Sequence, residues 1–354
     1  MDRRIQGRSG ESIKREGKLI MHKATYMEGT LHLIIRPDGP ILIKAGESGG
    51  ADPTLPDMEF VRSRQQGALQ VYLPGPSLKG VVRAQCERIC RTLDAPGRNP
   101  SDDNPPLADN PMGDGKSYKD EADMAYSSGK YLESLRETIK GDPQRTAIIY
   151  RRSAFTAQIF GSTSLAGRVR FADAYPSGEV SIEERNGVAI DRIYGSVAVG
   201  PFNYETVVSG DFVTSIAFRN LTLAQLGLLG LALRDLAAGR VAIGFGKSRG
   251  LGRVKLEMTA LELRYPACEL VGNTLKVIGK DVAVPDRTLA GLGAFCKDEG
   301  YLLPAQDSAK LPGGLAYAED TVRGMGVLLE ANGDAQVREI FTACMPAWKA
   351  QVSR

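Results

Sequence analysis

The most apolar stretch of the chain, residues 221–238, places the strongest constraint on its fold. Gln225 and Arg234 interrupt the apolar run, which argues against a membrane span. Thr222 stands where its side chain can cap the first turn of a helix, and Gly239 follows the last turn. The stretch therefore predicts a buried core helix.

Segments that alternate apolar and polar residues lie on both sides of this helix, at 211–221 and 252–263. Such alternation is typical of half-buried strands. An earlier part of the chain predicts strands at 30–35 and 168–175, with a helix from Ser77 between them. The order strand, helix, strand, strand, helix, strand is that of a ferredoxin-like α+β fold, an antiparallel sheet with helices on one face.

Shorter elements are expected between these. The turn RPDGP predicts a further strand at 41–44, joined to the first one. A short strand at 69–73 leads into the helix that starts at Ser77, and a short helix is expected at 131–140.

Two regions lie outside this pattern. Residues 94–129 are rich in Asp, Asn, Pro and Gly, which predicts a long, mobile surface insertion. The extension 265–354 is punctuated by Gly and Pro until a segment typical of a terminal helix, interrupted at Pro346. The sequence assigns this extension no role.

Composition and cysteine usage narrow the class of protein. The 354 residues are 42% hydrophobic and 25% charged, with a formal net charge of +3, which permits a nucleic-acid partner without requiring one. Five cysteines without a CxxC motif do not form a disulfide framework, so a reducing, cytoplasmic location is expected. Cys86 and Cys90 share the apolar face of the first helix and are expected to be buried thiols.

The N-terminal region argues against a secreted protein, and the histidines argue against a zinc protein. Residues 1–29 form a basic arm without an apolar run, so they are not a secretory signal, and no membrane partner is expected. His22 and His32 are the only histidines and have no neighbouring cluster of Cys or His. A zinc site is therefore not supported.

The stretch LPGPSLKGVVR forms the entrance to the first helix. Ser77 is a favoured capping residue, and Lys79 and Arg83 lie one turn apart near the N-terminal amides of the helix. These features fit a phosphate site. They also fit a well-capped core helix with solvated basic residues.

The stretch IGFGKSRGLGRVK, residues 243–255, is a second glycine-rich segment. It lacks the Walker pattern and the strand-then-helix context of a dinucleotide-binding fingerprint. Lys247, Arg249 and Arg253 stand among glycines, which indicates a backbone that lies against a phosphate chain. A crossing of solvated residues is the alternative.

Taken together, these stretches resemble a known family. Their order and spacing resemble those of the RAMP superfamily, and more closely those of backbone subunits of type III CRISPR effector complexes, which act in antiviral defence. The motifs that carry this resemblance are LPGPSLKGVVR, FGSTSLAGRVRFADA, VAIDRIYG, NYETVVSGDFVTSIAF and IGFGKSRGLGRVK. The resemblance implies an RNA-recognition-type ferredoxin-like domain at 30–264, with a thumb hairpin at about 193–205. It implies guide RNA, target RNA and other subunits of the complex, RAMP paralogues included, as partners.

The resemblance also implies which residues contact RNA. The guide backbone would be gripped by residues of the two motifs that carry basic side chains: Ser77, Lys79, Arg83, Lys247, Ser248, Arg249 and Arg253. Further basic candidates are Arg168, Arg170 and Arg192. Sequence would then be read by base pairing and not by the protein.

Catalytic members of the family cut target RNA with an aspartate in the loop before the first helix. Asp57, in DMEFVR, fits that position, and Asp52, in GGADP, is the second candidate. Such a carboxylate holds Mg²⁺ or Mn²⁺ or orients the 2′-hydroxyl for attack on its own phosphate, which leaves a 2′,3′-cyclic phosphate and a 5′-hydroxyl. Two alternatives stay open, namely a non-catalytic structural subunit of the same complex and a nuclease that processes precursor guide RNA.

The chain departs from the family pattern at one place. Some relatives carry a Cys-containing motif where this chain has SAFTAQIFG, so the resemblance does not imply a zinc site there.

Overall fold

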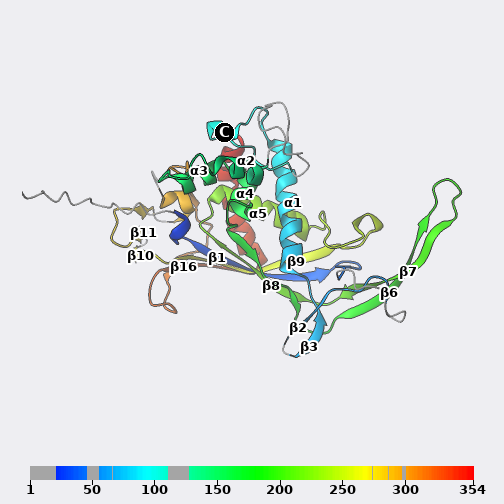
Figure 1. Cartoon of the computed structure of the whole chain (residues 1–354). Coiled ribbons are helices and arrows are strands. Elements are labelled where there is room, and N and C mark those ends of the chain that lie inside the picture. Colours follow the sequence, from blue (N-terminus) through cyan, green and yellow to red (C-terminus); the bar gives the residue numbers. More distant parts are fainter. Residues whose placement is uncertain are drawn as a thin grey trace, which may run out of the picture.

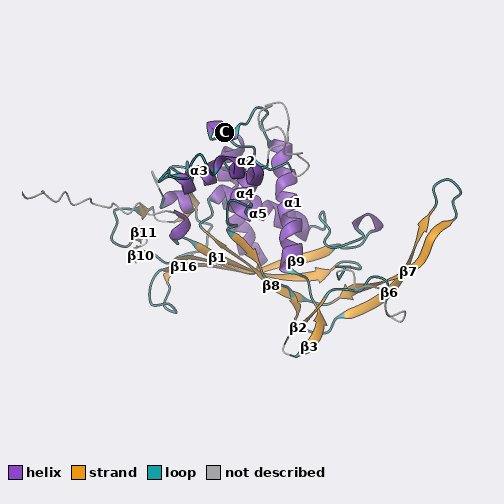
Figure 2. Cartoon of the chain, viewed as in Figure 1, coloured by secondary structure: helices purple, strands orange, loops and turns teal. Residues whose placement is uncertain are grey.

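A seven-stranded antiparallel sheet with helices on one face forms the centre of the molecule (Figures 1 and 2). This computed structural model describes residues 21–45, 56–65, 67–110, 127–272, 274–285, 287–296 and 300–354. The strand order is β15-β16-β9-β1-β8-β4, with β5 also paired to β8. The expected α+β class is confirmed.

Four strands and two helices occupy the middle of this arrangement. Their bounds are β1 Glu28–Pro37, α1 Gly75–Leu93, β4 Val169–Phe171, β8 Phe212–Arg219, α5 Leu223–Ala237 and β9 Val254–Tyr265. Alternate residues of β1, among them Leu31 and Leu33, are buried, as the period of two in the sequence predicts. The strand expected at 168–175 is divided between β4 and β5, Tyr175–Pro176.

The helix α5 begins as the sequence predicts. The Thr222 hydroxyl accepts a hydrogen bond from the Gln225 N–H at 3.2 Å, and the Gln225 side chain accepts one from the Thr222 N–H at 3.1 Å. This capping box satisfies two backbone donors that a helix start leaves unpaired. Gly230 lies so close to the Phe341 ring that a Cβ there would be 2.5 Å from it. Small residues therefore allow the C-terminal helices to pack closely on α5.

The predicted cap of α1 is wrong. The helix starts at Gly75 after Pro74, and Ser77 makes no capping bond but lies within the first turn. The Asp173 carboxylate accepts a hydrogen bond from the Gly75 N–H at 2.7 Å instead. A residue from a distant segment thus caps the helix.

The strand predicted at 41–44 is also wrong. Ile41 and Lys44 make only isolated bridges, to Val207 and Phe60. Both edges of β1 are already occupied, by β8 and by β9, so the segment that follows the RPDGP turn cannot pair with β1.

Two hairpins extend from the sheet. The longer one, β6 Ser181–Ile190 with β7 Val197–Ser209, projects away from the body of the molecule (Figure 1). The thumb expected at 193–205 corresponds to its turn and part of β7. The shorter one, β2 Arg62–Gln65 with β3 Ala68–Val71, lies on the side of the sheet opposite the helices (Figure 1).

Part of the expected mobile insertion is packed. Leu107 is 1% exposed, and its N–H donates to the Asp94 carboxylate at 2.8 Å. Arg98, whose side chain is 5% exposed, pairs with the same carboxylate at 2.8 Å. Residues 94–110 are therefore part of the helical layer, whereas 111–126 lie outside the described residues. The segment continues into α2 Ser128–Leu135, α3 Arg145–Arg151 and α4 Phe155–Phe160, of which α2 covers part of the helix expected at 131–140.

The C-terminal extension belongs to the same layers as the core. β16 Val327–Asn332 pairs with β9 and β15 Tyr317–Glu319 pairs with β16, so the extension widens the sheet. The terminal helix is interrupted, as expected, but at Cys344 and not at Pro346, which lies in the first turn of the second piece; the two pieces are α6 Gly333–Ala343 and α7 Met345–Val352. The remaining elements are β10 Cys268–Val271, β11 Thr274–Val277, β12 Ala283–Val284, β13 Thr288–Ala290, β14 Ser308–Lys310, and the short 3-10 helices η1 Met21–Lys23, η2 Pro100–Asp102, η3 Lys247–Arg249 and η4 Leu292–Ala294.

The structure also bears on the expectations for the cysteines, for a membrane-spanning helix and for the N-terminal arm. All five cysteines are free and buried, and burial raises the pKa of Cys86 and Cys90, so these thiols are inert core residues. Within the described parts of the chain, no helix has the length and apolar character needed to cross a membrane. Of the basic arm, 1–20 lie outside the described residues, while Met21 and Met27 are buried in the core.

A half-buried histidine gives the fold a pH dependence. Burial, followed by the positive charges of Arg168 and Arg219, lowers the pKa of His22 from 6.5 to about 4. The unfolded chain binds this proton near pH 6.5 but the folded chain only near pH 4, so the free energy of unfolding falls as the pH falls across that window. In His22→Phe, which keeps an aromatic ring beside Tyr301, urea denaturation is expected to show a shallower fall.

The matched control is His32→Gln, on the face of the sheet without helices, which leaves His22 and its neighbours in place and is therefore expected to keep the fall that His22 causes. An equally steep fall in His22→Phe and in the wild-type protein contradicts the assignment.

Candidate nucleic-acid interface

The glycine-rich loop at 243–252 lies against the segment that follows β1. The Phe245 N–H donates to the Leu42 carbonyl at 2.7 Å, and the Gly252 N–H donates to the Pro40 carbonyl at 2.8 Å. Gly252 has φ +90°, and a Cβ there would lie 2.0 Å from the Ile243 carbonyl oxygen. Glycine is required at this position because the loop packs against the protein's own backbone.

The tip of this loop is the short helix η3, which presents Lys247, Ser248 and Arg249 to solvent. The Arg249 guanidinium lies 5.3 Å from the centroid of the Phe202 ring on β7, a cation–π contact. With the described residues, Lys247 and Arg249 form no ion pair. The loop thus brings two positive charges, neither paired with a described acidic residue, to the part of the long hairpin where Phe202 pairs with Gly187.

Arg253, at the end of the loop, differs from the tip. Its guanidinium pairs with the Asp38 carboxylate at 2.9 Å, and Lys255 pairs with the same carboxylate at 3.2 Å. Asp38 therefore offsets part of the positive charge here.

The segment that contains Asp57 runs along the same part of the hairpin. One oxygen of the exposed Asp57 carboxylate accepts a hydrogen bond from the Asn203 N–H at 2.8 Å. Glu205 accepts from both terminal nitrogens of Arg62, at 2.7 and 2.8 Å, and this contact is the main reason that its pKa is lowered. Asp57 and Arg249 are therefore attached to neighbouring residues of β7. Asp52 lies outside the described residues.

The basic residues of α1 lie in a different environment. Lys79 is half-buried beside Gly167, and burial, followed by the charge of Arg83, lowers its pKa. Arg83 pairs with Glu87 at 2.8 Å and donates to the Gly161 carbonyl at 3.1 Å. No hydrogen bond or ion pair among the described residues connects this set to the glycine-rich loop. The two predicted halves of the RNA grip therefore share no such bond, and we describe them as two patches.

Arg168 does not fit the prediction that it contacts phosphate. It is 6% exposed, its guanidinium lies 4.3 Å from the centroid of the Tyr150 ring, and it donates to the Asn220 carbonyl at 2.6 Å. Burial lowers its pKa. Arg168 is a core residue, whereas Arg170 on β4 and Arg192 in the hairpin turn are exposed.

The comparison with known families covers both patches and the hairpin. Residues 38–255 match the profile of the RAMP superfamily. The chain belongs to the RAMP superfamily. This membership indicates a CRISPR-associated subunit that binds RNA. No curated protein matches the chain.

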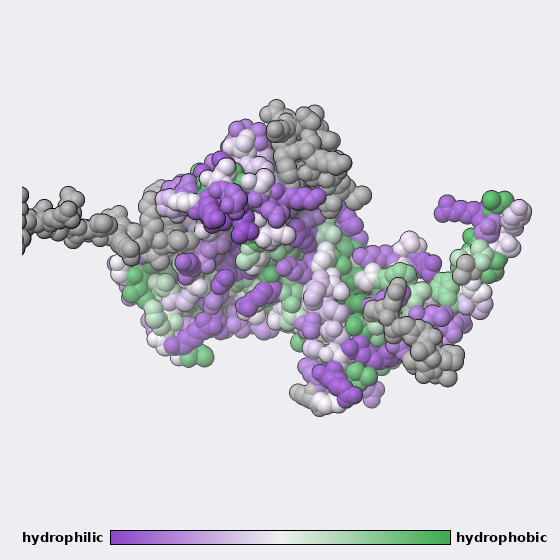
Figure 3. Space-filling model, viewed as in Figure 1, coloured by the Kyte–Doolittle hydropathy of each residue, from purple (hydrophilic) through white to green (hydrophobic). Residues whose placement is uncertain are grey.

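Reasoning from sequence missed the aromatic residues of the hairpin in this RAMP protein. Phe202 and Tyr204 lie on one face of β7 with ring centroids 6.2 Å apart. Aromatic residues two positions apart on an expected strand are the signal that could have identified them. Apolar residues also gather near the hairpin tip (Figure 3), where Ile193 and Tyr194 are each 83% exposed.

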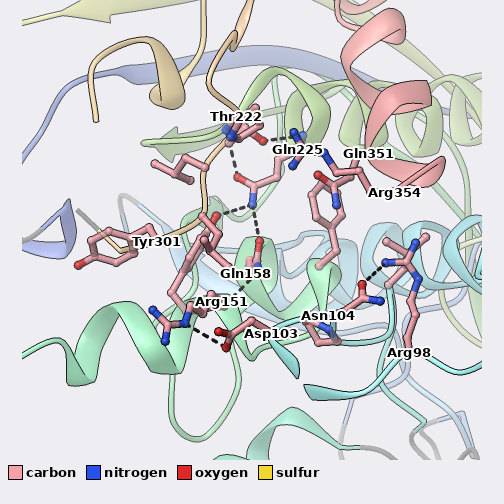
Figure 4. Close-up of a pocket in the computed structure, with 17 residues that line it drawn as sticks. Arg98, Asp103, Asn104, Arg151, Gln158, Thr222, Gln225, Tyr301, Gln351 and Arg354 are labelled. Carbon is pink, nitrogen blue, oxygen red and sulfur yellow. Dashed lines mark hydrogen bonds and ion pairs between the residues drawn. The ribbon is translucent and has the colours of Figure 1, made fainter. Parts of the chain in front are cut away.

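A cavity of about 200 Å³ lies in the helical layer of the RAMP protein (Figure 4). Gln225 donates to the Tyr150 hydroxyl at 2.9 Å and to the Gln158 side chain at 3.2 Å. Arg151 pairs with Asp103 at 3.0 Å. Because these polar groups bond to one another, we assign the cavity a structural role, which is to join residues 94–110 to the core.

Proposed function

We propose that this chain is a backbone subunit of a type III CRISPR effector complex and holds the guide RNA on the tip of its glycine-rich loop and on the long hairpin beside Phe202. The observation that carries this proposal is the contact of Arg249 with Phe202, beside the exposed charge of Lys247, which no described acidic residue pairs with. A cation next to an aromatic ring offers both phosphate contact and base stacking.

The core supports the same function. The order β9-β1-β8-β4, with α1 and α5 as the connecting helices, is the ferredoxin-like arrangement that we propose for RNA recognition. Lys79, Arg83, Arg170 and Arg192 would add backbone contacts. Other subunits of the complex, RAMP paralogues among them, would bind the guide RNA next to this chain. We propose that the complex acts in the cytoplasm.

The first test removes charge from the loop tip. In the double variant Lys247→Ala and Arg249→Ala, the affinity for guide RNA is expected to fall about tenfold, and the salt dependence to flatten by roughly 1.4 in log–log slope, about 0.7 for each lost phosphate contact. Fluorescence anisotropy at several salt concentrations measures both. Lys310→Ala with Lys349→Ala, two exposed lysines of the extension, is the matched control. Equal losses in the two double variants would contradict the proposal.

We also propose that the subunit cleaves target RNA, with Asp57 or Asp52 as the catalytic carboxylate. Asp57 supports this because one of its oxygens is anchored to β7 while its side chain remains exposed next to the proposed guide-binding residues. The free oxygen can accept a hydrogen bond from the attacking 2′-hydroxyl and orient it toward the adjacent phosphate. The products would be a 2′,3′-cyclic phosphate and a 5′-hydroxyl.

The donor chemistry of this site fits a metal held mainly by RNA. The described residues include no group of three or more His, Cys, Asp or Glu side chains that could hold a metal ion. A single carboxylate together with RNA phosphate oxygens is nevertheless a common environment for Mg²⁺, which keeps several of its waters. When bound, Mg²⁺ or Mn²⁺ would neutralise charge that develops on the phosphate.

Processing of precursor guide RNA by a histidine is less well supported. His22 is partly enclosed by Tyr150 and Tyr301, and its lowered pKa of about 4 disfavours it as a proton donor near neutral pH. His32 lies on the face of the sheet without helices, 3.7 Å from Glu262. The two histidines therefore lie apart from one another and do not form a common site for processing RNA.

A further inference from the structure

We infer that the cavity between the β2–β3 hairpin and β5 binds one unpaired nucleobase of RNA, stacked on Tyr175. This inference rests on the proposed RNA-binding function and adds a site for a base to the contacts with the RNA backbone. The cavity measures about 520 Å³, within the range of small-ligand sites, and opens on the side of the sheet without helices.

The central strands lack the aromatic platform that sheets of this kind use for stacking. RNA-recognition sheets stack bases on aromatic side chains of their open face. On β1 that face carries Thr30, His32 and Ile34, and on β8 it carries Ser215 and Ala217. None of these described residues is Phe, Tyr or Trp, so a stacked base must lie elsewhere on the sheet.

Tyr175 supplies such a platform at the edge. Its backbone pairs with Val213 of β8, and its ring stacks on Tyr72, with centroids 5.5 Å apart and planes 15° apart. A bridge between Leu73 and Ala174 holds the two segments together. Tyr175, but not Tyr72, lines the cavity, so one tyrosine supports the ring of the other before any ligand arrives.

Polar groups on the opposite wall can bind the edge of a base. Gln65, Ala68 and Gln70 line it, and the register of β2 with β3 places them on one face of the hairpin. The Gln70 amide donates to the Gln65 amide oxygen. With the described residues these two side chains make no other hydrogen bond, so donors and acceptors remain for a base.

Basic residues continue the path along the open face. Arg219 follows Val213 on the same side of β8, six residues or roughly 20 Å further on. Arg170 of β4 and Arg219 both line a second cavity, of about 350 Å³. Neither makes an ion pair with the described residues. An RNA strand with one base against Tyr175 can therefore place phosphates near these guanidinium groups.

The test uses the full chain with a short single-stranded oligoadenylate that carries one 2-aminopurine, and with an abasic oligonucleotide of equal length. Tyr175→Ala is expected to bind the oligoadenylate about tenfold more weakly and to lose the quenching of 2-aminopurine. Tyr175→Phe, the matched control, keeps both properties. Gln65→Ala with Gln70→Ala, on an exposed hairpin, is expected to weaken oligoadenylate binding independently of any effect of Tyr175 on folding. All variants bind the abasic oligonucleotide as the wild-type protein does.

Failure of this inference differs from failure of the proposed function. If the Tyr175 and glutamine variants bind oligoadenylate normally while Lys247→Ala with Arg249→Ala does not, the base site is wrong and the proposed function stands. Equal losses for oligoadenylate and the abasic oligonucleotide also overturn the base site. If the wild-type protein binds neither oligonucleotide, the proposed function is wrong and the inference with it.

Discussion

Asp57→Asn is expected to reduce cleavage of target RNA by the assembled complex at least about 100-fold. The asparagine oxygen can still accept the Asn203 N–H, so the contact that joins this segment to β7 is kept. What the variant loses is the negative charge that would orient the 2′-hydroxyl and hold a divalent ion. Cleavage is measured with a labelled target RNA in the presence of Mg²⁺, and guide binding is measured in the same preparation.

The controls separate chemistry from folding. Glu59→Gln removes a carboxylate two residues away and is expected to cleave normally, while Asp52→Asn is tested alongside because the sequence makes Asp52 the second candidate. A loss in Asp52→Asn alone would move the catalytic role to that residue. Cleavage that survives in both aspartate variants would contradict the nuclease proposal and leave a non-catalytic subunit.

Local sequence patterns predicted the elements whose cause is local. The period of two in β1, β8 and β9 follows from burial of one face, and the Thr222 capping box needs only residues three apart. The cap of α1 could not be found in this way, because Asp173 is 98 residues from Gly75. The failed strand at 41–44 has a similar cause, since the occupancy of both edges of β1 depends on distant strands.

The polar composition of residues 94–110 predicted a mobile segment, and this prediction was wrong for a related reason. Asp, Asn and Pro are typical of mobile segments, but here Asp94 and Arg98 form an ion pair that anchors Leu107 in the helical layer. Polar residues can order a segment when their partners are fixed by the fold.

The candidate site was predictable in its charges but not in its contacts. Lys247 and Arg249 are exposed, as the glycine-rich motif indicates. Arg168 looks equivalent in sequence but lies under Tyr150 and Asn220, which are distant along the chain. The approach of Arg249 to Phe202 depends on how the hairpin folds back to the sheet, and no local pattern encodes it.

The glycines of the loop provide the second large expected effect. Gly252 and Gly250 both have positive φ, +90° and +83°, but a Cβ at Gly252 would lie 2.0 Å from the Ile243 carbonyl oxygen, whereas Gly250 has no atom within 4 Å of that position. Gly250→Ala therefore adds only backbone strain, about 1 kcal/mol. Gly252→Ala adds a clash with backbone and is expected to lower the free energy of unfolding by roughly 3–5 kcal/mol.

The same comparison connects the loop to RNA binding. The clash at Gly252 disrupts its hydrogen bonds with Pro40 and Ile243, both 2.8 Å, which hold the base of the loop. Lys247 and Arg249 would then lose their position beside Phe202, and the RNA affinity of Gly252→Ala is expected to fall to that of the double charge variant. Urea denaturation and anisotropy measure the two effects, with Gly250→Ala close to wild type in RNA affinity. If both glycine variants bind RNA equally well, the tip does not depend on the packing of its base, and preorganisation of these charges is not how the loop holds RNA.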